Sequence, residues 1–521
     1  MCPQTVEALE LYIEPDASLL LSRVSHILTG DGVKSYLTGG FVRDVLLKRD
    51  TADIDIAVDA DALEVASRVA MALGGKYVPL DEVNGVGRVI LFNHGVTSTR
   101  ERWEIDFSKL KGNIEQDLAQ RDFTVDAMAI DLEELTFLDE GELIKVGEAM
   151  LKMPALIDPF GGRDDLNKGI LRVVADTAFP SDAARLLRAV RLAAELGFII
   201  ENETEALISR HSGLITGVAG ERVREELLRL LALPGAGNLL AYSDEIGLLT
   251  AMIPEMVRCK GVEQPKEHFW DVFRHSLQTV VAAEFLLREG SWDHTDAKVL
   301  AAVPWSDEIR KHFAQEVSSG STRKSLLKLA ALLHDVAKPQ TKTIEESGRV
   351  RFLGHGEQGA AIASDILERL RFSAKEIKMV AMMVKYHLRP TQMGRYELPT
   401  RRAIYRYFRD TGDTGVDILF LSLADHLAAR GPTLDMAAWH EHTRIVEYVL
   451  AQRYEQQSLT APPRLVDGND LINIFNLRPG RKIGKILEAV REAQAAGELA
   501  TREEAINHIE RLLNILNSQN S

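Results

Sequence analysis

The stretch LTGGFVRDVLLKRDTADIDIAV, residues 37–58, places a glycine pair, Gly39 and Gly40, shortly before two aspartates, Asp53 and Asp55. The β-branched and aromatic run before the glycines predicts a short strand that stops at them. FVRDVLLKR has the apolar spacing of a helix, and DIDIAVDA alternates as a strand does. This order of strand, glycine turn, helix and strand predicts a mixed α/β fold.

Segments on both sides extend this prediction. A helix over residues 5 to 30 is expected before the stretch, and ALEVASRVAMALGG after it reads as an amphipathic helix ended by glycines. RVILFNH and RWEIDFS are further strand candidates. From about residue 180 to 520 nearly every segment has helical spacing. The expected fold class is α+β, a mixed α/β head followed by mostly α-helical domains.

Length and composition limit the kind of protein. A chain of 521 residues is too long for one core and predicts roughly three or four domains. Cys2 and Cys259 are too few for a disulfide scaffold or a thiolate metal site. No apolar run could span a bilayer and the start lacks a signal-peptide layout, so we expect a cytoplasmic protein without a membrane partner. The net charge of −15 argues against a broadly basic surface but permits a local basic groove.

The aspartates suggest a metal site. Asp53 and Asp55 are two apart on a predicted strand, so both side chains point to one face. Adjacent carboxylates repel each other unless a cation lies between them, and oxygen ligands suit Mg²⁺. Asp106, in WEIDFSKLKG, can supply a third carboxylate from a neighbouring strand. Three carboxylates can hold two metal ions, one that activates a hydroxyl and one bound to a nucleoside triphosphate.

The glycine pair fits the same chemistry. Gly39 and Gly40 let backbone amides approach a phosphate without an intervening side chain, and Arg43 can add positive charge. Each feature alone is more simply an ordinary turn or a surface pair of aspartates. Their occurrence together, in this order, favours a nucleotide site.

The resemblance to a known family rests on five ordered motifs. LTGGFVRDVLLKRDTADIDIAV, DLAQRDFTVDAMAID, IDPFGGRDDLNKGILR, SDAARLLRAVRLAAELGF and ERVREELLRLL resemble those of the class II tRNA nucleotidyltransferase and poly(A) polymerase family, over roughly the first half of the chain. The resemblance implies a polymerase-β-like nucleotidyltransferase head in which Asp53, Asp55 and Asp106 are catalytic and the first two bind Mg²⁺. It also implies nucleotide binding around the triphosphate and sugar by Gly39, Gly40, Arg43, Arg121 and Asp122. Asp126 stands where the family usually has Asn.

The fourth motif predicts base selection. Asp182 and Arg185 are three apart on a predicted helix and so share a face. A carboxylate accepts hydrogen bonds and a guanidinium donates them, which matches the edges of cytosine and adenine but not those of uracil and guanine. An intrahelical salt bridge is the simpler alternative. The resemblance also implies nucleotide binding by Arg188 and Arg191, and Ser181 replaces the family's usual Glu.

The connection after Asp106 bears on the product. Family members that complete CCA usually have a flexible loop there, whereas here EIDFSKLKGN runs almost directly into IEQDLAQRDFT. By resemblance, a short connection is typical of enzymes that add only two C residues. We favour complete CCA addition, because single-enzyme systems are the commoner case, with CC addition as the alternative.

Histidine and aspartate recur through the helical region. A lone histidine on an apolar face is usually a core residue, but several with an adjacent His-Asp pair suit a divalent metal ion. Their order resembles the HD-type metal phosphohydrolase superfamily, which implies core ligands His275, His334, Asp335 and Asp425, with His355 and His387 holding a second metal or the phosphate. Lys338 is a candidate phosphate contact. The implied activity is phosphoester hydrolysis on RNA-end phosphates, and a structural or RNA-binding domain is the alternative.

The expected organisation has four parts: a catalytic head at 1–155, a helical neck with the selection motif at 156–245, an HD domain at 246–455 and a tRNA-contacting region at 456–521. In the expected reaction the terminal tRNA hydroxyl attacks the α-phosphate of CTP or ATP and pyrophosphate leaves. A poly(A) polymerase is the nearest rival. A protein uridylyltransferase or a non-catalytic RNA-binding protein ranks lower, because DPFGG and the site carboxylates are present.

Two basic segments are candidate RNA contacts. Arg481 and Lys482 follow a turn that opens a predicted helix, where amides could meet a phosphate. RRAIYRYFR, residues 401–409, mixes basic and aromatic residues as RNA grooves do. The alternatives are a simple helix cap and a helix with buried aromatics and a basic outer face.

Overall fold

The computed structural model describes residues 11–12, 15–51, 53–92, 102–134, 150–151, 156–295, 297–393, 398–455 and 464–518. The chain forms two compact units, residues 1–217 and 218–521. The division into four domains stays a prediction.

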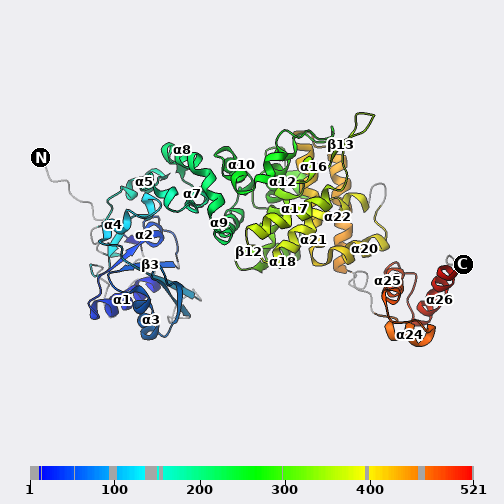
Figure 1. Ribbon diagram of the computed structural model, residues 1–521, viewed down its shortest axis with the longest axis horizontal. Helices are drawn as coiled ribbons and strands as arrows, with labels where there is room; N and C mark the ends of the chain where they lie inside the picture. Colours follow the sequence, from blue (N-terminus) through cyan, green and yellow to red (C-terminus); the bar gives the residue numbers. More distant parts are fainter. Residues whose placement is uncertain are drawn as a thin grey trace. The chain divides into compact units, whose positions relative to one another are not determined.

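The first unit is built on a six-stranded sheet of order β4–β5–β6–β3–β2–β7 (Figure 1). Its strands are β2 (Ser35–Thr38), β3 (Asp53–Val58), β4 (Lys76–Asp81), β5 (Val86–Phe92), β6 (Arg102–Lys109) and β7 (Ala129–Asp131). Strands β3 and β6 are parallel, and the other neighbours are antiparallel. The predictions of β2, β3, β5 and β6 are confirmed. The sequence did not predict β4, an edge strand that contains a proline and is exposed over much of its length.

Helices and short strands complete this unit. They are β1 (Leu11–Tyr12), α1 (Pro15–Gly30), α2 (Gly39–Leu46), α3 (Ala62–Leu73), α4 (Ile114–Leu118), β8 (Met150–Leu151), α5 (Gly162–Lys168), β9 (Ile170–Leu171), α6 (Ala178–Ser181), α7 (Arg185–Leu196), β10 (Ile199–Ile200) and α8 (Asn202–His211). Helix α3 packs on β4, β5 and β6 and ends at left-handed Gly74, as predicted. The helix expected over residues 5–30 begins only at Pro15. Leu11–Tyr12 is a strand, and the rest of residues 5–14 lies outside the described residues.

The expected helix through the fourth motif is interrupted at Asp182. The backbone of Asp182 is extended, with φ −152° and ψ 99°, between α6 and α7. Its carboxylate accepts a hydrogen bond of 3.2 Å from the backbone N–H of Ala184. The prediction that Asp182 and Arg185 share one helix face is therefore wrong, because a short polar side chain here bonds the local backbone and stands outside the helix.

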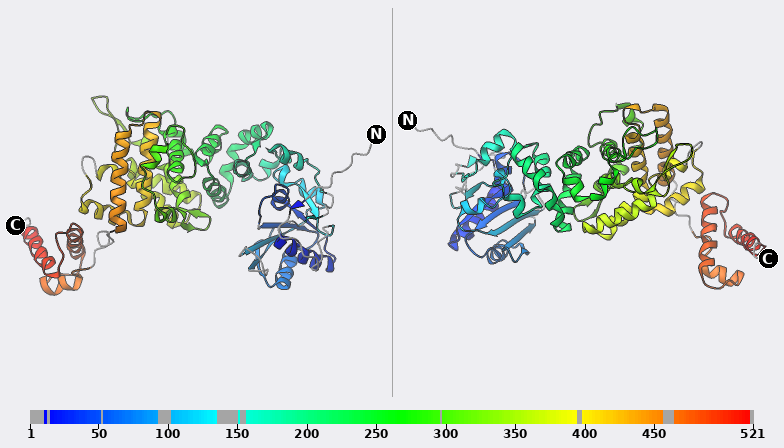
Figure 2. Two further views of the ribbon diagram at one scale, coloured as in Figure 1. Left: turned by 180° about the vertical axis from the view of Figure 1, so that it is seen from behind. Right: turned by 45° about the horizontal axis from the view of Figure 1, so that its top comes forward.

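The second unit is mainly helical, as expected, and runs from green to red in Figures 1 and 2. Its helices are α9 (Gly220–Ala232), α10 (Ala236–Glu245), α11 (Leu248–Met252), α12 (Val272–Leu286), α13 (Ala297–Ala301), α14 (Asp307–Ala314), α15 (Arg323–Leu333), α16 (Lys338–Thr341), α17 (His355–Arg369), α18 (Ala374–Tyr386), α19 (Arg389–Met393), α20 (Arg401–Thr411), α21 (Gly415–Arg430), α22 (Met436–Glu455), α24 (Gly468–Phe475), α25 (Arg481–Ala495) and α26 (Arg502–Ser518). Short hairpins, β11–β12 (Glu316–Ser318, Ser321–Thr322) and β13–β14 (Lys342–Ile344, Val350–Phe352), interrupt it. Among the described residues, no helix has the length and apolar character needed to cross a membrane.

Five helices form the centre of the middle region. Helix α12 packs on α15 and α21, and α15 packs on α18, which also contacts α17 (Figure 1). These helices carry the histidines and aspartates singled out in the sequence. Buried apolar side chains surround them, which holds each polar residue on a rigid element.

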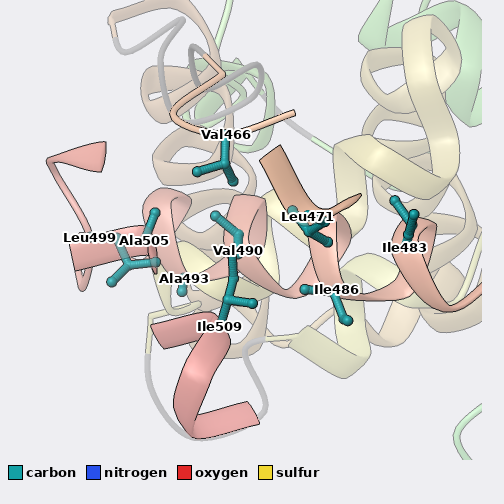
Figure 3. Close-up of a cluster of buried hydrophobic side chains, with 9 residues drawn as sticks. All are labelled: Val466, Leu471, Ile483, Ile486, Val490, Ala493, Leu499, Ala505 and Ile509. Carbon is teal, nitrogen blue, oxygen red and sulfur yellow. The ribbon is translucent and has the colours of Figure 1, made fainter. Parts of the chain in front are cut away.

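The last three helices have a core of their own. Figure 3 shows nine apolar side chains of this region that gather together: Val466, Leu471, Ile483, Ile486, Val490, Ala493, Leu499, Ala505 and Ile509. Helix α25 opens directly after Gly480, and its first residues, Arg481 and Lys482, are exposed. Their contact with RNA stays a prediction.

Helix α20 has buried aromatics and a basic outer face. Tyr405, Tyr407 and Phe408 are buried. Arg402 and Arg406 form ion pairs with Glu492 of α25, at 3.2 Å and 2.5 Å. The segment therefore docks the C-terminal helices by charge, and its aromatic rings are not an exposed stacking surface for RNA.

Two candidate active sites, a carboxylate face and a histidine–aspartate cluster

The first site is a row of polar residues across four strands of the sheet. Thr38 on β2 is in register with Asp55 on β3, Asp55 with Asp106 on β6, and Asp106 with Arg88 on β5. Register partners on neighbouring strands point to the same face. The structure thus brings Asp55 and Asp106 together, as the sequence predicted. Asp53 is two residues before Asp55 on the same face and is exposed.

Arg88 is a site residue that the sequence reasoning missed. Its Nε and Nη2 atoms donate hydrogen bonds of 2.7 Å each to the two carboxylate oxygens of Asp106. Its Nη1 atom bonds Glu104, which is in register with Asp53. The alternation of Glu104 and Asp106 in RWEIDF was the available signal, since it matches the spacing of the two aspartates on β3.

The ionised form of Asp55 is disfavoured on this face. Burial raises its pKa to about 6, opposed by Arg121 and reinforced by Asp106, Asp126 and Asp53. A raised pKa means that the ionised carboxylate lacks compensating charge, which a divalent cation beside it would supply. The residues therefore fit the expected metal ions, whose ligands would be Asp53 and Asp55.

The glycine turn lies directly against this carboxylate. Gly39 has φ +67°, and a Cβ there would lie 3.0 Å from both Asp55 Oδ2 and Arg121 Nη1. Arg121 Nη2 donates to Thr38 Oγ1 at 3.0 Å and to Asp117 Oδ2 at 3.3 Å. A Cβ on Gly40 would lie 3.3 Å from Arg43 Nη2. Glycine is thus needed at position 39 for backbone conformation and for close approach to the site.

Arg43 has carboxylate partners within the protein. It is buried, and its Nη1 lies 2.6 Å from Asp126 Oδ1 while its Nε lies 2.9 Å from Asp44 Oδ1. Burial raises the pKa of Asp126, and Arg43 opposes that shift. Asp126, which departs from the family pattern, is therefore the buried counter-ion of Arg43. A contact between Arg43 and the triphosphate stays a prediction.

The fourth-motif arginines have defined partners in this structure. Arg188 Nε lies 2.8 Å from Asp122 Oδ2. Arg185 donates to the backbone oxygen of Gln120 at 2.7 Å and to Ser181 Oγ at 3.3 Å. Buried Arg191 pairs with Glu195 one turn later on α7. These contacts connect α7 to the second motif, and nucleotide binding by these arginines and Asp182 stays a prediction.

Residues of the third motif pack against the second motif and form hydrogen bonds with it. Buried Asp165 accepts hydrogen bonds from Thr124 Oγ1 at 2.7 Å and from Arg172 Nε at 3.0 Å. A Cβ on Gly162 would lie 2.2 Å from the backbone oxygen of Thr124. Gly162 therefore lets α5 pack directly against the segment that holds Asp122 and Asp126.

The second site is a buried cluster in the second unit. His275 Nε2 lies 3.0 Å from Asp425 Oδ1 and 3.2 Å from His334 Nε2, which lies 3.1 Å from Asp335 Oδ2. On the other side of Asp335, its Oδ1 lies 3.5 Å from His355 Nε2 and 3.9 Å from His387 Nε2. All six side chains predicted as metal ligands are therefore brought together: His275, His334, Asp335, His355, His387 and Asp425.

Hydrogen bonds to backbone carbonyl oxygens orient three of the imidazole rings. The Nδ1 atoms of His334, His355 and His387 lie 2.7–2.8 Å from the carbonyl oxygens of Ala331, Phe352 and Val384. A proton held on Nδ1 leaves the Nε2 lone pair available, which is the usual arrangement of a metal-bound histidine. Adjacent Nε2 atoms 3.2 Å apart match two ligands of one transition metal ion at about 2.1 Å each.

The electrostatics of the cluster suit a cation. Burial alone would raise the pKa of Asp335, but His334 and Lys338 hold it well below its usual range. Burial lowers the pKa of His387 to about 3, so this ring stays neutral. Lys338 Nζ lies 2.5 Å from Asp335 Oδ2 and 2.6 Å from Gln264 Oε1. Its expected contact with phosphate stays a prediction.

Family profiles match the two regions of the chain that contain these sites. The family profile of the poly(A) polymerase head domain matches residues 35–172, and that of the HD domain matches 272–430. A third profile, a probable RNA and SrmB-binding site of polymerase A, matches 197–259. Both kinds of catalytic domain generally use divalent metal ions.

Curated relatives cover nearly the whole chain. It is 32% identical over 481 residues to an A-adding tRNA nucleotidyltransferase of Deinococcus radiodurans, covering 91% of this chain and 94% of that protein. It is 31% identical over 480 residues to a CC-adding tRNA nucleotidyltransferase of Thermus thermophilus, covering 90% and 92%. A solved CCA-adding enzyme with CTP has the same fold, with a TM-score of 0.61 at 20% identity over 96% of each chain.

The fold and the carboxylate row define a nucleotidyltransferase head, and the buried cluster defines an HD domain in the same chain. The chain belongs to the family of tRNA nucleotidyltransferases and poly(A) polymerases, and it is an enzyme of the nucleotidyltransferase class.

Proposed function

We propose that this protein is a CC-adding tRNA nucleotidyltransferase, which transfers CMP from CTP to the tRNA 3′ end and releases pyrophosphate. The pairing of Asp55 on β3 with Asp106 on β6 is the observation that supports nucleotidyl transfer. Asp53 and Asp55 would hold Mg²⁺, which lowers the pKa of the attacking 3′-hydroxyl and neutralises the triphosphate. Asp106 would complete the carboxylate set. The relatives named above act on tRNA, which supports the same substrate here.

The connection after Asp106 supports CC addition, in place of the complete CCA addition expected from the sequence. Strand β6 ends at Lys109 and α4 begins at Ile114, so only a few residues join them. Asn113 and Gln116 form a reciprocal capping box at the start of α4, which fixes the turn. A short, capped connection supports CC addition, because the family resemblance implies a flexible loop at this place in members that complete CCA. The Thermus relative, named as CC-adding, supports the same assignment, whereas the Deinococcus relative is named as A-adding.

Nucleotide selection is assigned to the segment around α7. Asp182 and Arg185 offer an acceptor and a set of donors, which suit the amino group and the ring acceptors of cytosine. Arg185 is tied to Ser181 and to the backbone of Gln120, next to Arg121 and Asp122 of the second motif. Gly39, Gly40, Arg121 and Asp122 would surround the triphosphate and sugar, with Arg188 and Arg191 supporting Asp122 and α7.

Incorporation assays test the assignment. The substrates are tRNA transcripts that end before CCA, after C and after CC, each given CTP alone, ATP alone or both. We expect CMP to be added until the tRNA ends in CC, with no AMP added to the CC end. AMP addition to that end alone would make the protein A-adding, and both activities would restore CCA addition. Long A tails on any RNA would exclude the tRNA assignment.

We also propose that the HD cluster holds a divalent metal ion and hydrolyses a phosphoester. The convergence of its Nε2 atoms on the oxygens of Asp335 and Asp425 supports metal binding. Such an ion would supply an activated water and charge for the phosphate. Metal analysis of the purified chain, with hydrolysis assays on 2′-phosphate and 2′,3′-cyclic nucleotides, tests it. A metal-free cluster after growth in metal-supplemented medium would exclude the proposal.

A further inference from the structure

The guanidinium of Arg88 is hydrogen-bonded to Asp106, the third carboxylate of the proposed catalytic site. Both oxygens of Asp106 accept hydrogen bonds from it, at 2.7 Å each, in the two-pronged geometry that gives an arginine–carboxylate pair its strength. The pair is partly shielded, with 28% of the Arg88 side chain and 23% of the Asp106 side chain exposed. A cation and this guanidinium therefore compete for the same oxygens.

Glu104 gives Arg88 a second partner on the same face. The third nitrogen of the guanidinium, Nη1, already bonds Glu104. Glu104 also pairs with Arg102, whose Nη2 lies 2.5 Å from its Oε1. Because Glu104 is two residues from Asp106 on β6, Arg88 can release Asp106 and keep a carboxylate partner without leaving the sheet.

The other end of the row has its own arginine. Arg121 stands beside Asp55 at the glycine turn, so the two in-register carboxylates lie between Arg121 and Arg88. An arginine is always charged, and a cation that approaches Asp106 meets its repulsion as well as the occupied oxygens. A metal ion that arrives with a triphosphate carries negative charge and is repelled less.

We propose that Arg88 is an internal counter-cation that keeps the carboxylate face closed to metal ions alone, and that it moves from Asp106 to Glu104 when metal enters with nucleotide. The inference rests on the proposed metal site at Asp53 and Asp55. It makes Arg88 and Glu104 positioning residues, because they act through Asp106. It also gives the enzyme an order of binding, in which metal and nucleoside triphosphate enter together.

Site-resolved metal binding tests the proposal on the full chain. Fe²⁺ with ascorbate and peroxide cuts the backbone near a bound ion, and fragment sizes separate cuts within 53–106 from cuts within 275–425. We expect little cutting in the head of the wild type without nucleotide. Arg88→Gln is expected to lower the Fe²⁺ concentration for half-maximal head cutting at least about tenfold, because a repelling charge is removed. Arg88→Lys, with a single ammonium, is expected to be intermediate.

Matched variants and a second readout complete the design. Arg68→Gln removes the same charge from a position that pairs with Asp31 and touches neither Asp106 nor Glu104, and its cutting is expected to match the wild type. The melting temperature of the metal-free Arg88→Gln chain is expected to fall and to recover when Mn²⁺ is added. Equal cutting in wild type and Arg88→Gln would overturn the role of Arg88. No head cutting in any variant, even with CTP, would instead overturn the metal site on which the proposal rests.

Discussion

The carboxylate face and the histidine–aspartate cluster differ in their solvent exposure and in the groups that balance their charged side chains. On the carboxylate face, Asp55 and Asp106 lie between Arg121 and Arg88, on a sheet surface that water reaches in part. In the cluster, five of the six side chains are nearly inaccessible to solvent. Burial lowers the pKa of His275 and His387, whereas Asp335 and Asp425 raise the pKa of His334 against the effect of burial. The first is an oxygen site flanked by two arginines, and the second is a nitrogen-rich site in which Lys338 pairs with Asp335.

This difference would allow one chain to bind two kinds of metal ion at separate sites. Oxygen ligands on an accessible face suit Mg²⁺, which keeps part of its water shell and arrives with phosphate. Buried imidazole and carboxylate suit a transition metal that stays bound. The predictions below test this contrast, from the largest expected effect to the smallest.

Reciprocal substitutions give the largest effect. Asp55→Asn is expected to lower the rate of CMP addition by about 10³-fold or more, because it removes a charge needed to bind the catalytic metal. Asp335→Asn is expected to abolish metal binding and hydrolysis in the HD domain and to leave CMP addition within about twofold. Single-turnover incorporation and metal analysis measure the two effects. If either substitution removed both activities, the two sites would not be independent.

Chelation is expected to distinguish the two sites by how tightly each one retains its metal ion. After dialysis against EDTA at neutral pH, CMP addition is expected to stop and to return at once when Mg²⁺ is added. The metal of the HD cluster is expected to remain bound through that treatment, because its ligands are buried and several act together. Metal analysis before and after dialysis checks this. The Asp335→Asn chain serves as the metal-free reference, and equal loss from both sites would contradict the contrast.

Gly39→Ala tests the close packing of the carboxylate face. A Cβ at position 39 lies 3.0 Å from Asp55 Oδ2 and Arg121 Nη1, so the site must shift, at an expected loss of about 10²-fold in CMP addition. Gly32→Ala is the matched control, since Gly32 has φ +66° but nothing within 4 Å of its Cβ. Both substitutions carry the same backbone strain, of about 1–2 kcal/mol. Equal activity losses would show that strain alone is responsible.

The two sites are expected to respond to pH with opposite sign. The pKa of Asp55 is raised to about 6, above its unfolded value of about 3.9, so its folded form gains stability as pH falls from 6 toward 4. The pKa of His387 is lowered to about 3, so the stability that it contributes is lost as pH falls below about 6.5. Between pH 7 and 5 the effect is about 1 kcal/mol for Asp55 and about 2 kcal/mol for His387.

Hydrogen exchange on the metal-free chain measures these slopes, once the data are corrected for intrinsic rates. Peptides from β3 are expected to be better protected at pH 5 than at pH 7, and peptides from the end of α18 less protected. The Asp55→Asn chain is expected to lose the change in β3 and keep that in α18. The same sign in both regions would contradict the different electrostatics of the two sites.

Much of both sites was predictable from local pattern. Period-two alternation set the faces of β3 and β6, so the meeting of Asp55 with Asp106 followed once the strands were identified. The His-Asp pair and its spaced histidines predicted the cluster, which the packing of α12, α15, α18 and α21 brings together. The first prediction depends on the period of two along each strand, and the second on the order of the histidines and aspartates, whose resemblance to the HD superfamily implied the ligand set.

Two of the misses depend on contacts between separate segments of the chain, and the third depends on a local contact with the backbone. Arg88 reaches Asp106 only because β5 lies next to β6, a pairing that no short motif specifies. The partnership of Arg43 with Asp126 links positions 83 residues apart. Asp182 was expected inside a helix by periodicity, but its carboxylate bonds the backbone of Ala184 and ends that pattern.

The capped connection between β6 and α4 also determines how easily the product can change in evolution. An insertion between Lys109 and Ile114 would disrupt a capping box worth about 1 kcal/mol, a small part of a domain's stability of about 5–15 kcal/mol. A one-residue insertion within β6 ahead of Asp106 would turn Asp106 to the opposite face and destroy the site. Under the proposed function, specificity would lie in a segment whose length can vary, while the chemistry would lie in one whose register cannot. A lineage could gain or lose the final nucleotide by insertion or deletion without touching a catalytic residue.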